Sequence, residues 1–455
     1  MLIPGVTALL SFMYSRNILR FSVSSNLRNS CWQSFNMMPP LDVLSDLPKS
    51  VIDEVLMRLS LQDAVRTSIL SKKWRYNWCT LPQLKLDQTL WKTTKDLTCF
   101  TSNFTKIIYH VLTLHEGPIT QFTLSIPHLE GCPNFDNLIY FLSRNGIQHL
   151  VLELQGGNLY TLPSSFFTCS QMRHLSLKNC LIRPPPVFKG FERLISLKLN
   201  RVTISSELLG SLISHSPLLE NLVLQYSDIS NPVEISAPKL RSFVFIGNIH
   251  FIRLKYVPLL SKVSYEPRAF SVEAEHDLAK IFESIPAIEH LCWNLQYVKA
   301  RNAGPVEFIP TRLLSAFNCL KRLYVSWICL REFFELSIAL CLIRSSPYLE
   351  EIEIETCDTE GGKYYEPVPC GVVDEIPASF SDMTFNYLRT VKLRHVTGIG
   401  PEMQLIKVLL AKSPALLRMV IDPEVGEDKK SLKVLAEITK FQRASSKAEV
   451  VYNVD

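Results

Sequence analysis

The sequence lacks any long uninterrupted apolar run. None of its stretches reaches 18 apolar residues, because the best candidate, 327–343, is interrupted by Arg331, Glu332 and Glu335. A membrane-spanning helix needs about 20 mostly apolar residues. The sequence therefore predicts no membrane segment.

Charge of one sign is also not concentrated anywhere. Lys and Arg number 48 against 43 Asp and Glu, which gives a formal net charge of +5, and no run of five basic residues occurs. Proteins that bind nucleic acids usually cluster their basic residues. We therefore expect no nucleic-acid partner.

Paired cysteines and catalytic motifs are missing as well. The 12 cysteines form no CxxC pair, and several, such as Cys292 and Cys341, stand in apolar runs, which is typical of reduced, buried thiols. No HExxH, zinc or GxSxG pattern occurs. "GIGPEM" (398–403) lacks the third glycine of a dinucleotide-binding loop and predicts a turn. These absences favour a non-catalytic protein without cofactor or metal.

The first 36 residues differ in composition from the rest. They contain three arginines, many serines and no aspartate or glutamate. Such a composition is typical of organelle transit peptides, and the alternative is an upstream extension with translation starting at Met37 or Met38. We expect residues 1–38 to form no folded domain. We expect the protein in the nucleus, the cytoplasm or both, with organelle targeting as the alternative.

A six-residue pattern, apolar-x-x-apolar-x-apolar, recurs along most of the chain. Its copies start 20 to 39 residues apart, mostly in or near the period of leucine-rich repeats. The second half of the pattern alternates, so it predicts a short strand with one buried face. The copies are 119–124, 147–152, 172–177, 194–199, 219–224, 240–245, 260–265, 288–293, 320–325, 349–354, 388–393 and 416–421.

Four helices are predicted to end at a proline. Pro217, Pro286, Pro347 and Pro414 each stand two residues before a strand pattern, and proline cannot continue a helix. One strand and one helix or loop per repeat, stacked side by side, make a solenoid. The alternative, an ordinary α/β domain with chance matches, is disfavoured by a dozen copies at similar spacing.

A short segment before the repeats, residues 44–75, carries many large apolar side chains. Pro48 suits the start of a helix, and an i, i+3, i+4, i+7 stripe follows it. Ser60 and Asp63 are spaced as a capping box for a second helix. The stripe consists of Ile52, Val55, Leu56 and Leu59, and the apolar face of the second helix of Ala64, Val65, Ser68 and Ile69.

A third short helix is predicted to begin at Ser71 and to carry Trp74 and Trp78. Three short helices are too small to bury these apolar side chains among themselves. Part of this apolar surface must therefore face the repeats or another protein.

The stretch "LPKSVIDEVLMRLSLQDAVRTSILSKKWRYNW" closely resembles the F-box of plant F-box proteins, through its initial "LP", its "VRTSILSKKWR" and its closing Trp. Residues 385–421 resemble the FBD region. The chain is thus similar to the plant F-box/FBD/LRR-repeat family. The resemblance implies an α/β fold: a three-helix F-box at 39–84, an irregular leucine-rich-repeat solenoid at 85–384 with parallel strands and with helices or loops on its outer face, and an FBD region at 385–455 that closes it.

The resemblance also implies a function. The protein would be the substrate adaptor of an SCF-type (Skp–cullin–F-box) ubiquitin ligase, with the F-box binding a Skp-type adaptor and through it a cullin, and the repeats binding an unknown target protein. The alternative is a leucine-rich-repeat scaffold with a non-functional F-box that acts outside a ligase. The motif match places at or behind the adaptor interface Leu47, Pro48, Ile52, Val55, Leu56, Val65, Leu70 and Trp74; for Val55, Ile69 and Trp78 a position in the core is the alternative.

One strand pattern is strongly acidic. Glu351, Glu353 and Glu355 alternate with apolar residues and should point away from the core. They predict either a solvated face or a surface that contributes to partner selection.

Overall fold

The computed structural model describes residues 47–87, 97–126, 135–227, 229, 231–247, 252–267, 287–295, 316–331, 333–357, 383–424 and 428–453. The chain divides into two compact units, Met1–Leu194 with Leu199–Thr203, and Ile195–Lys198 with Ile204–Asp455. Within the described residues, no helix has the length and apolar character needed to cross a membrane. The extension expected at 1–38 lies outside the described residues.

The first unit begins with two short α-helices, α2 (Lys49–Met57) and α3 (Leu61–Arg66), followed by the 3-10 helix η3 (Thr67–Ile69). Pro48 stands at the N-cap of α2, as its fixed φ predicts. The Ser60 hydroxyl accepts from the backbone N–H of Asp63 at 3.2 Å, which confirms the predicted cap of α3. Local sequence signals thus set the start of both helices.

The third predicted helix is wrong. Residues after Ser71 form turns, and only a 3-10 helix, η4 (Asn77–Thr80), follows. The Ser68 hydroxyl donates to the Arg75 carbonyl oxygen at 2.9 Å, which folds the chain back onto η3. Trp74 and Trp78 are both buried. Packing of the two indoles therefore outweighs helix propensity in setting the backbone path of this segment.

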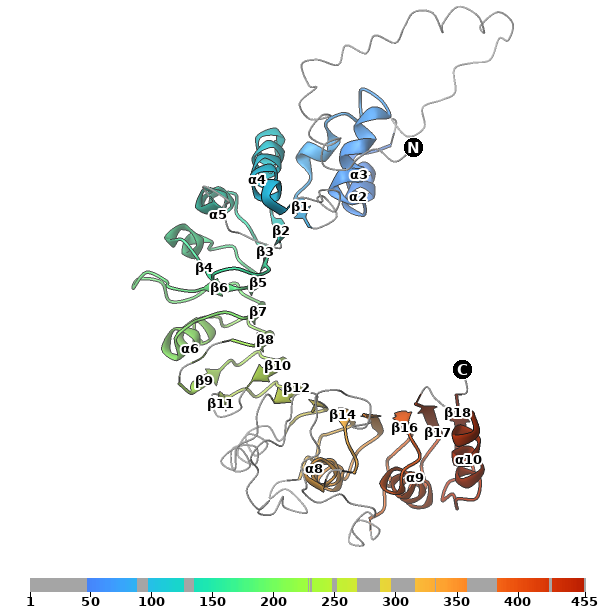
Figure 1. Ribbon diagram of the computed structural model, residues 1–455. Coiled ribbons are helices and arrows are strands. Elements are labelled where there is room, and N and C mark those ends of the chain that lie inside the picture. The colour runs from blue at the N-terminus through green and yellow to red at the C-terminus, as the bar shows by residue number, and fades with distance from the viewer. Residues whose placement is uncertain are drawn as a thin grey trace, which may run out of the picture. The chain divides into compact units, whose positions relative to one another are not determined.

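Parallel strands make up the rest of the first unit (Figure 1). The order β1, β2, β3, β5 follows the sequence, with α4 and α5 between strands. The elements are β1 (Gln83–Leu86), α4 (Leu97–Leu114), β2 (Gln121–Ile126), α5 (Phe135–Arg144), β3 (His149–Leu154), β4 (Tyr160–Thr161), η6 (Ser164–Thr168), β5 (His174–Lys178) and β6 (Cys180–Leu181).

The second unit repeats the same arrangement over a longer stretch, again with parallel strands in sequence order. Strand β7 (Ser196–Asn200) has residues in both units. The other elements are α6 (Ser206–Ser214), β8 (Asn221–Gln225), β9 (Val233–Ser236), β10 (Ser242–Gly247), β11 (Ile252–Tyr256), β12 (Lys262–Pro267), β13 (His290–Asn294), β14 (Arg322–Ile328), α8 (Phe333–Arg344), β15 (Glu351–Thr356), β16 (Thr390–Val396), α9 (Gly400–Lys412), β17 (Arg418–Pro423), α10 (Asp428–Ile438) and β18 (Glu449–Tyr452).

Every predicted strand pattern contains a strand, from β2 to β17. Three of the four proline-terminated helices are present as α6, α8 and α9, and the one before Pro286 lies outside the described residues. Strand β1 was not predicted, although "LPQLKL" (81–86) carries the same apolar spacing. This confirms the irregular leucine-rich-repeat solenoid expected from the sequence.

Most strands of the large sheet bury one face and leave the other, here called the open face, toward solvent. In β15, Ile352 and Ile354 are fully buried, whereas Glu351, Glu353 and Glu355 are partly exposed. Apart from single-residue shifts near the ends of β14, β16 and β11, neighbouring strands pair residue for residue, as in Leu323 beside Ile352. Within each unit the apolar positions therefore stack into a continuous core beneath the strands.

A left-handed backbone recurs at one position of the repeat. The five non-glycine residues with positive φ in the described chain all stand seven residues after the first apolar position of their pattern. Asn179, Arg201 and Tyr226 directly follow their strands, whereas Trp327 and His395 are the next-to-last residues of β14 and β16. These residues are Asn179, Arg201, Tyr226, Trp327 and His395, with φ between 50° and 64°.

A buried carboxylate fixes the turn before α9. The Glu402 carboxylate, 4% exposed, accepts from the backbone N–H groups of Thr397 (2.9 Å), Gly398 (2.7 Å) and Ile399 (3.3 Å). Burial raises the pKa of Glu402, against the effect of these hydrogen bonds. Glu335 caps the start of α8 in a similar way, accepting from the Cys329 N–H at 2.6 Å.

Glu402→Ala should lower the free energy of unfolding by about 2 kcal/mol, because it leaves buried backbone donors without an acceptor. Glu402→Gln keeps an acceptor oxygen and should lose less than half of that amount. Urea denaturation of the two variants provides the measurement. Equal losses in both would show that the hydrogen bonds do not stabilise this turn.

Candidate functional site

Exposed apolar side chains concentrate in the N-terminal helical segment. Six of the nineteen exposed large apolar or aromatic residues of the described chain lie between residues 51 and 70. Monomeric proteins seldom leave so many large side chains together in solvent. They are Val51, Val55, Met57, Leu59, Ile69 and Leu70, called here the helical apolar set.

Half of the residues that the motif match selected are accessible to a partner. Val55 is 42% and Leu70 57% exposed, Pro48 is exposed and Leu47 is partly exposed. These side chains can contact another protein without unfolding of the segment.

The other four selected residues belong to the core of the segment. Ile52, Leu56, Val65 and Trp74 are all less than 9% exposed. They can support an interface only by holding α2 and α3 in place.

Sequence reasoning missed part of the accessible set. Val51 was not singled out, and Ile69, placed on the apolar face of the second predicted helix, lies in η3 and is 71% exposed. Val51, Val55 and Leu59 are spaced i, i+4, i+8, which is itself a signal of a second apolar stripe on α2. Trp78 is buried, in agreement with the core alternative, whereas Val55 and Ile69 are not.

Backbone and side-chain hydrogen bonds connect the C-terminal end of this helical segment to the repeats. The Glu116 N–H donates to the Cys79 carbonyl oxygen at 2.8 Å, and the His115 imidazole Nε2 lies 2.8 Å from the Leu81 carbonyl oxygen. The Thr120 N–H donates to the Pro82 carbonyl oxygen at 2.9 Å. The buried side of the segment thus packs within the first unit, and its exposed apolar residues remain on the outside.

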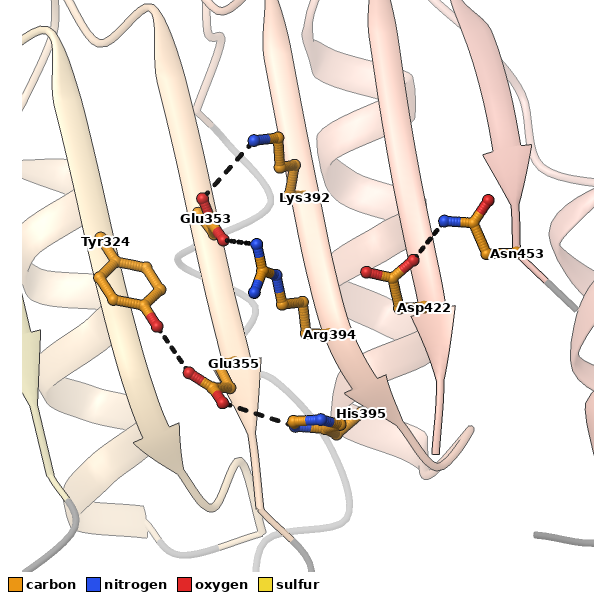
Figure 2. Close-up of polar contacts among 8 residues, drawn as sticks. All are labelled: Tyr324, Glu353, Glu355, Lys392, Arg394, His395, Asp422 and Asn453. Atoms are coloured by element: carbon orange, nitrogen blue, oxygen red, sulfur yellow. Dashed lines mark hydrogen bonds and ion pairs between the residues drawn. The ribbon is translucent and has the colours of Figure 1, made fainter. Parts of the chain in front are cut away.

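The open face of the second unit carries a network of charges (Figure 2). Glu353 of β15 contacts Arg394 of β16 at 2.7 Å and Lys392 at 3.7 Å. Arg322 of β14 contacts Glu351 at 3.1 Å. Neighbouring strands therefore alternate in sign across this part of the face.

One acid of this network contacts a phenol and an imidazole. The Tyr324 hydroxyl donates to the Glu355 carboxylate at 2.6 Å, and the His395 Nδ1 lies 3.8 Å from its other oxygen. Burial, and then Glu355 itself, raises the pKa of Tyr324 to about 12. The phenol therefore stays protonated near neutral pH and remains a donor.

Comparison with known proteins identifies both parts of the chain. The family model of the F-box domain matches residues 44–85, and the model of the leucine-rich repeats of FBD-associated F-box protein At5g56370 matches residues 135–354. The F-box/FBD/LRR-repeat protein At1g13570 of Arabidopsis thaliana is 32% identical over 422 residues, covering 91% of this chain and 99% of that protein. The chain belongs to the F-box/FBD/LRR-repeat family.

A second relative from Arabidopsis thaliana covers a similar share of this chain. The F-box/FBD/LRR-repeat protein At1g51370 is 25% identical over 437 residues, with 90% of this chain and 95% of that protein covered. Among solved structures, a leucine-rich-repeat protein of Leptospira interrogans, LIC12759, is 13% identical, covers 81% of this chain and 94% of its own, and has a TM-score of 0.25.

The F-box match gives the helical apolar set its context. All six of its residues lie inside the matched range 44–85. These accessible apolar residues of the F-box/FBD/LRR-repeat protein therefore belong to its F-box domain.

Proposed function

We propose that this protein is the substrate-recognition subunit of an SCF-type ubiquitin ligase. Its F-box binds a Skp-type adaptor and, through that adaptor, a cullin, while the repeats bind a target protein. The observation that carries the proposal is the exposure of the helical apolar set within the F-box match. The subunit contributes no catalytic side chain and increases the rate of ubiquitin transfer by proximity.

Apolar anchors surrounded by charges suit such an interface. Glu54 on α2 pairs with Arg58, which follows α2, and Asp63 pairs with Arg66 on α3; all four are exposed and each pair is 2.9 Å apart. Exposed ion pairs of this kind add little stability. They add polar groups to the same helical segment as the apolar anchors, and a polar rim around an apolar centre is typical of protein interfaces.

Copurification of the intact chain with a Skp-type adaptor tests the proposal. The double variant Leu47→Ala, Pro48→Ala should weaken the complex by about tenfold and leave the repeats folded, because both residues precede α2 and are accessible. Affinity measured by surface plasmon resonance and melting temperature measured on the same samples separate the two effects. If the intact chain does not bind an adaptor that a control F-box protein binds, the chain acts instead as a repeat scaffold outside a ligase.

A further inference from the structure

Two exposed lysines flank an uncharged, partly apolar area on the open face of the second unit. Strands β7, β8, β10 and β12 are neighbours in the large sheet, and α6 with the β9–β11 pair covers their buried side (Figure 1). On the open face, β8 and β10 carry Val223, Val244 and Ile246, which are all partly exposed. Lys198 on β7 and Lys262 on β12 are exposed on either side of them.

The backbone register places Lys198 beside the two valines. Val223 pairs with Val244 across β8 and β10. On the other side of β8, the Asn221 N–H donates to the Ile195 carbonyl oxygen at 3.1 Å. The same bond links β8 to β10 and β10 to β12, where equivalent positions of the repeat pair with each other. Lys198 is therefore the neighbour of Val223 on the open face.

Lys262 lies diagonally beyond the valines. Val244 pairs with Ser264 of β12, and Lys262 precedes Ser264 by two residues on the same face. With strands about 4.8 Å apart and this offset along β12, the Cα atoms of Lys198 and Lys262 are about 16 Å apart. In an extended segment, residues i and i+4 are about 14 Å apart, and the side chain of i+2 points the same way. Two lysine side chains easily bridge the difference.

The charges of the two lysines are not neutralised by acids of the chain. On β16, by contrast, Arg394 contacts Glu353 of the next strand. Among the residues that the structure describes, neither Lys198 nor Lys262 forms an ion pair. The acid on the open face of these four strands, Glu266, stands at the opposite end of β12 from Lys262. Both ammonium groups are thus available to a partner of opposite charge.

The surroundings of Lys262 are basic as well. His290 of β13 pairs in register with Lys262, and Arg322 of β14 pairs with His290. Burial, and then the charges of Arg322 and Lys262, lower the pKa of His290, against a smaller opposite effect of Glu289. The electrostatic potential beside Lys262 is therefore positive and favours a carboxylate there.

We propose that the open face of β7, β8, β10 and β12 binds an extended segment of the target protein in which an apolar side chain stands two positions from an acidic one on each side. The site rests on the proposed function and gives the chemistry of its target. The apolar side chain contacts Val223 and Val244, and the two carboxylates pair with Lys198 and Lys262. An apolar centre with charges at its rim is typical of protein interfaces, and charge complementarity makes such a contact selective.

The test measures peptide binding to the full chain by fluorescence anisotropy. The probe is a labelled peptide with the order glutamate, serine, leucine, serine, glutamate between serine ends. Three comparison peptides carry glutamine for both glutamates, serine for leucine, or the same residues with the two glutamates adjacent. We expect the probe to bind, and each comparison peptide to bind about tenfold more weakly. No binding of the probe, or equal binding of all four peptides, would overturn the proposal.

Lysine variants locate the site on the open face. Lys198→Gln and Lys262→Gln should each weaken binding of the probe about tenfold. The control Lys255→Gln removes the same charge from β11, where Lys255 pairs with Glu234 outside the large sheet, and should leave the affinity unchanged. The melting temperature of each sample shows whether the fold is retained. Equal affinities in all three variants would place the peptide elsewhere and refute this site.

Reversal of charge gives a readout that loss of structure cannot produce. The double variant Lys198→Glu, Lys262→Glu should bind the peptide with lysines in place of both glutamates more tightly than the original probe. An unchanged preference for the acidic probe would contradict the assigned contacts.

Adaptor binding is measured on the same variants and should be unchanged, since the substitutions lie outside the F-box match at 44–85. A chain that binds the acidic probe but no adaptor would disprove the ligase function and keep the site. A chain that binds the adaptor but does not distinguish the peptides would keep the ligase function and disprove the site.

Discussion

An Ile69→Asp, Leu70→Asp double variant is expected to lose at least about 100-fold in affinity for a Skp-type adaptor, because two anchor residues at an interface commonly contribute more than 2 kcal/mol each. The two side chains are 71% and 57% exposed, so carboxylates there are solvated in the free protein. The fold should therefore be unaffected. Isothermal titration calorimetry with the purified adaptor measures the loss.

The control is a second pair of aspartates at apolar residues of similar exposure. Val187 and Leu432 are 88% and 60% exposed and lie far from the F-box in sequence. Val187→Asp, Leu432→Asp should bind the adaptor like the unmodified chain. A similar loss in both double variants would mean that added negative charge, and not the removed apolar contact, weakens the complex.

The largest loss of stability is expected from Gly398→Ala, by at least about 3 kcal/mol. Gly398 has a φ of +79°, a conformation that costs an L-residue energy. A Cβ there would also collide with a methyl group of Val434, which is buried on α10. Chemical denaturation followed by circular dichroism measures the change.

Gly146→Ala isolates the backbone part of this effect. Gly146 has a similar φ of +65°, but a Cβ there would meet no atom within 4 Å. Its replacement should cost only about 1–2 kcal/mol. If both substitutions cost the same, the packing of Val434 against the turn contributes nothing.

The strands could be predicted from the sequence because their signal is redundant. A single match to the pattern is weak, but the copies recur at similar spacing, and prolines such as Pro347 mark the same phase before several of them. Burial then follows directly, since Ile352 and Ile354 sit where the alternation places them.

The details of the F-box were harder to predict. Helical spacing distinguishes the faces of α2 only when something is known to cover one of them. Val55 and Leu56 are adjacent in sequence, and both belong to apolar stripes, yet only Leu56 is buried. The path of Ser71 to Trp78 depends on where two indoles fit, which is tertiary information that propensities do not contain.

The left-handed position at the end of the strands could not be predicted at all. Asn and His favour that conformation, but Arg, Tyr and Trp do not, so no common residue preference marks the position. The geometry of the repeat imposes it.

The residue-for-residue register has a consequence for how such a protein can evolve. Residues about thirty positions apart in sequence, such as Arg322 and Glu351, become neighbours about 4.8 Å apart across the sheet. Gain or loss of one whole repeat would shift the order of side chains on the open face by one step, while each remaining apolar position would still meet its equivalent below. New combinations of recognition residues can therefore arise by duplication or deletion of repeats without redesign of the core.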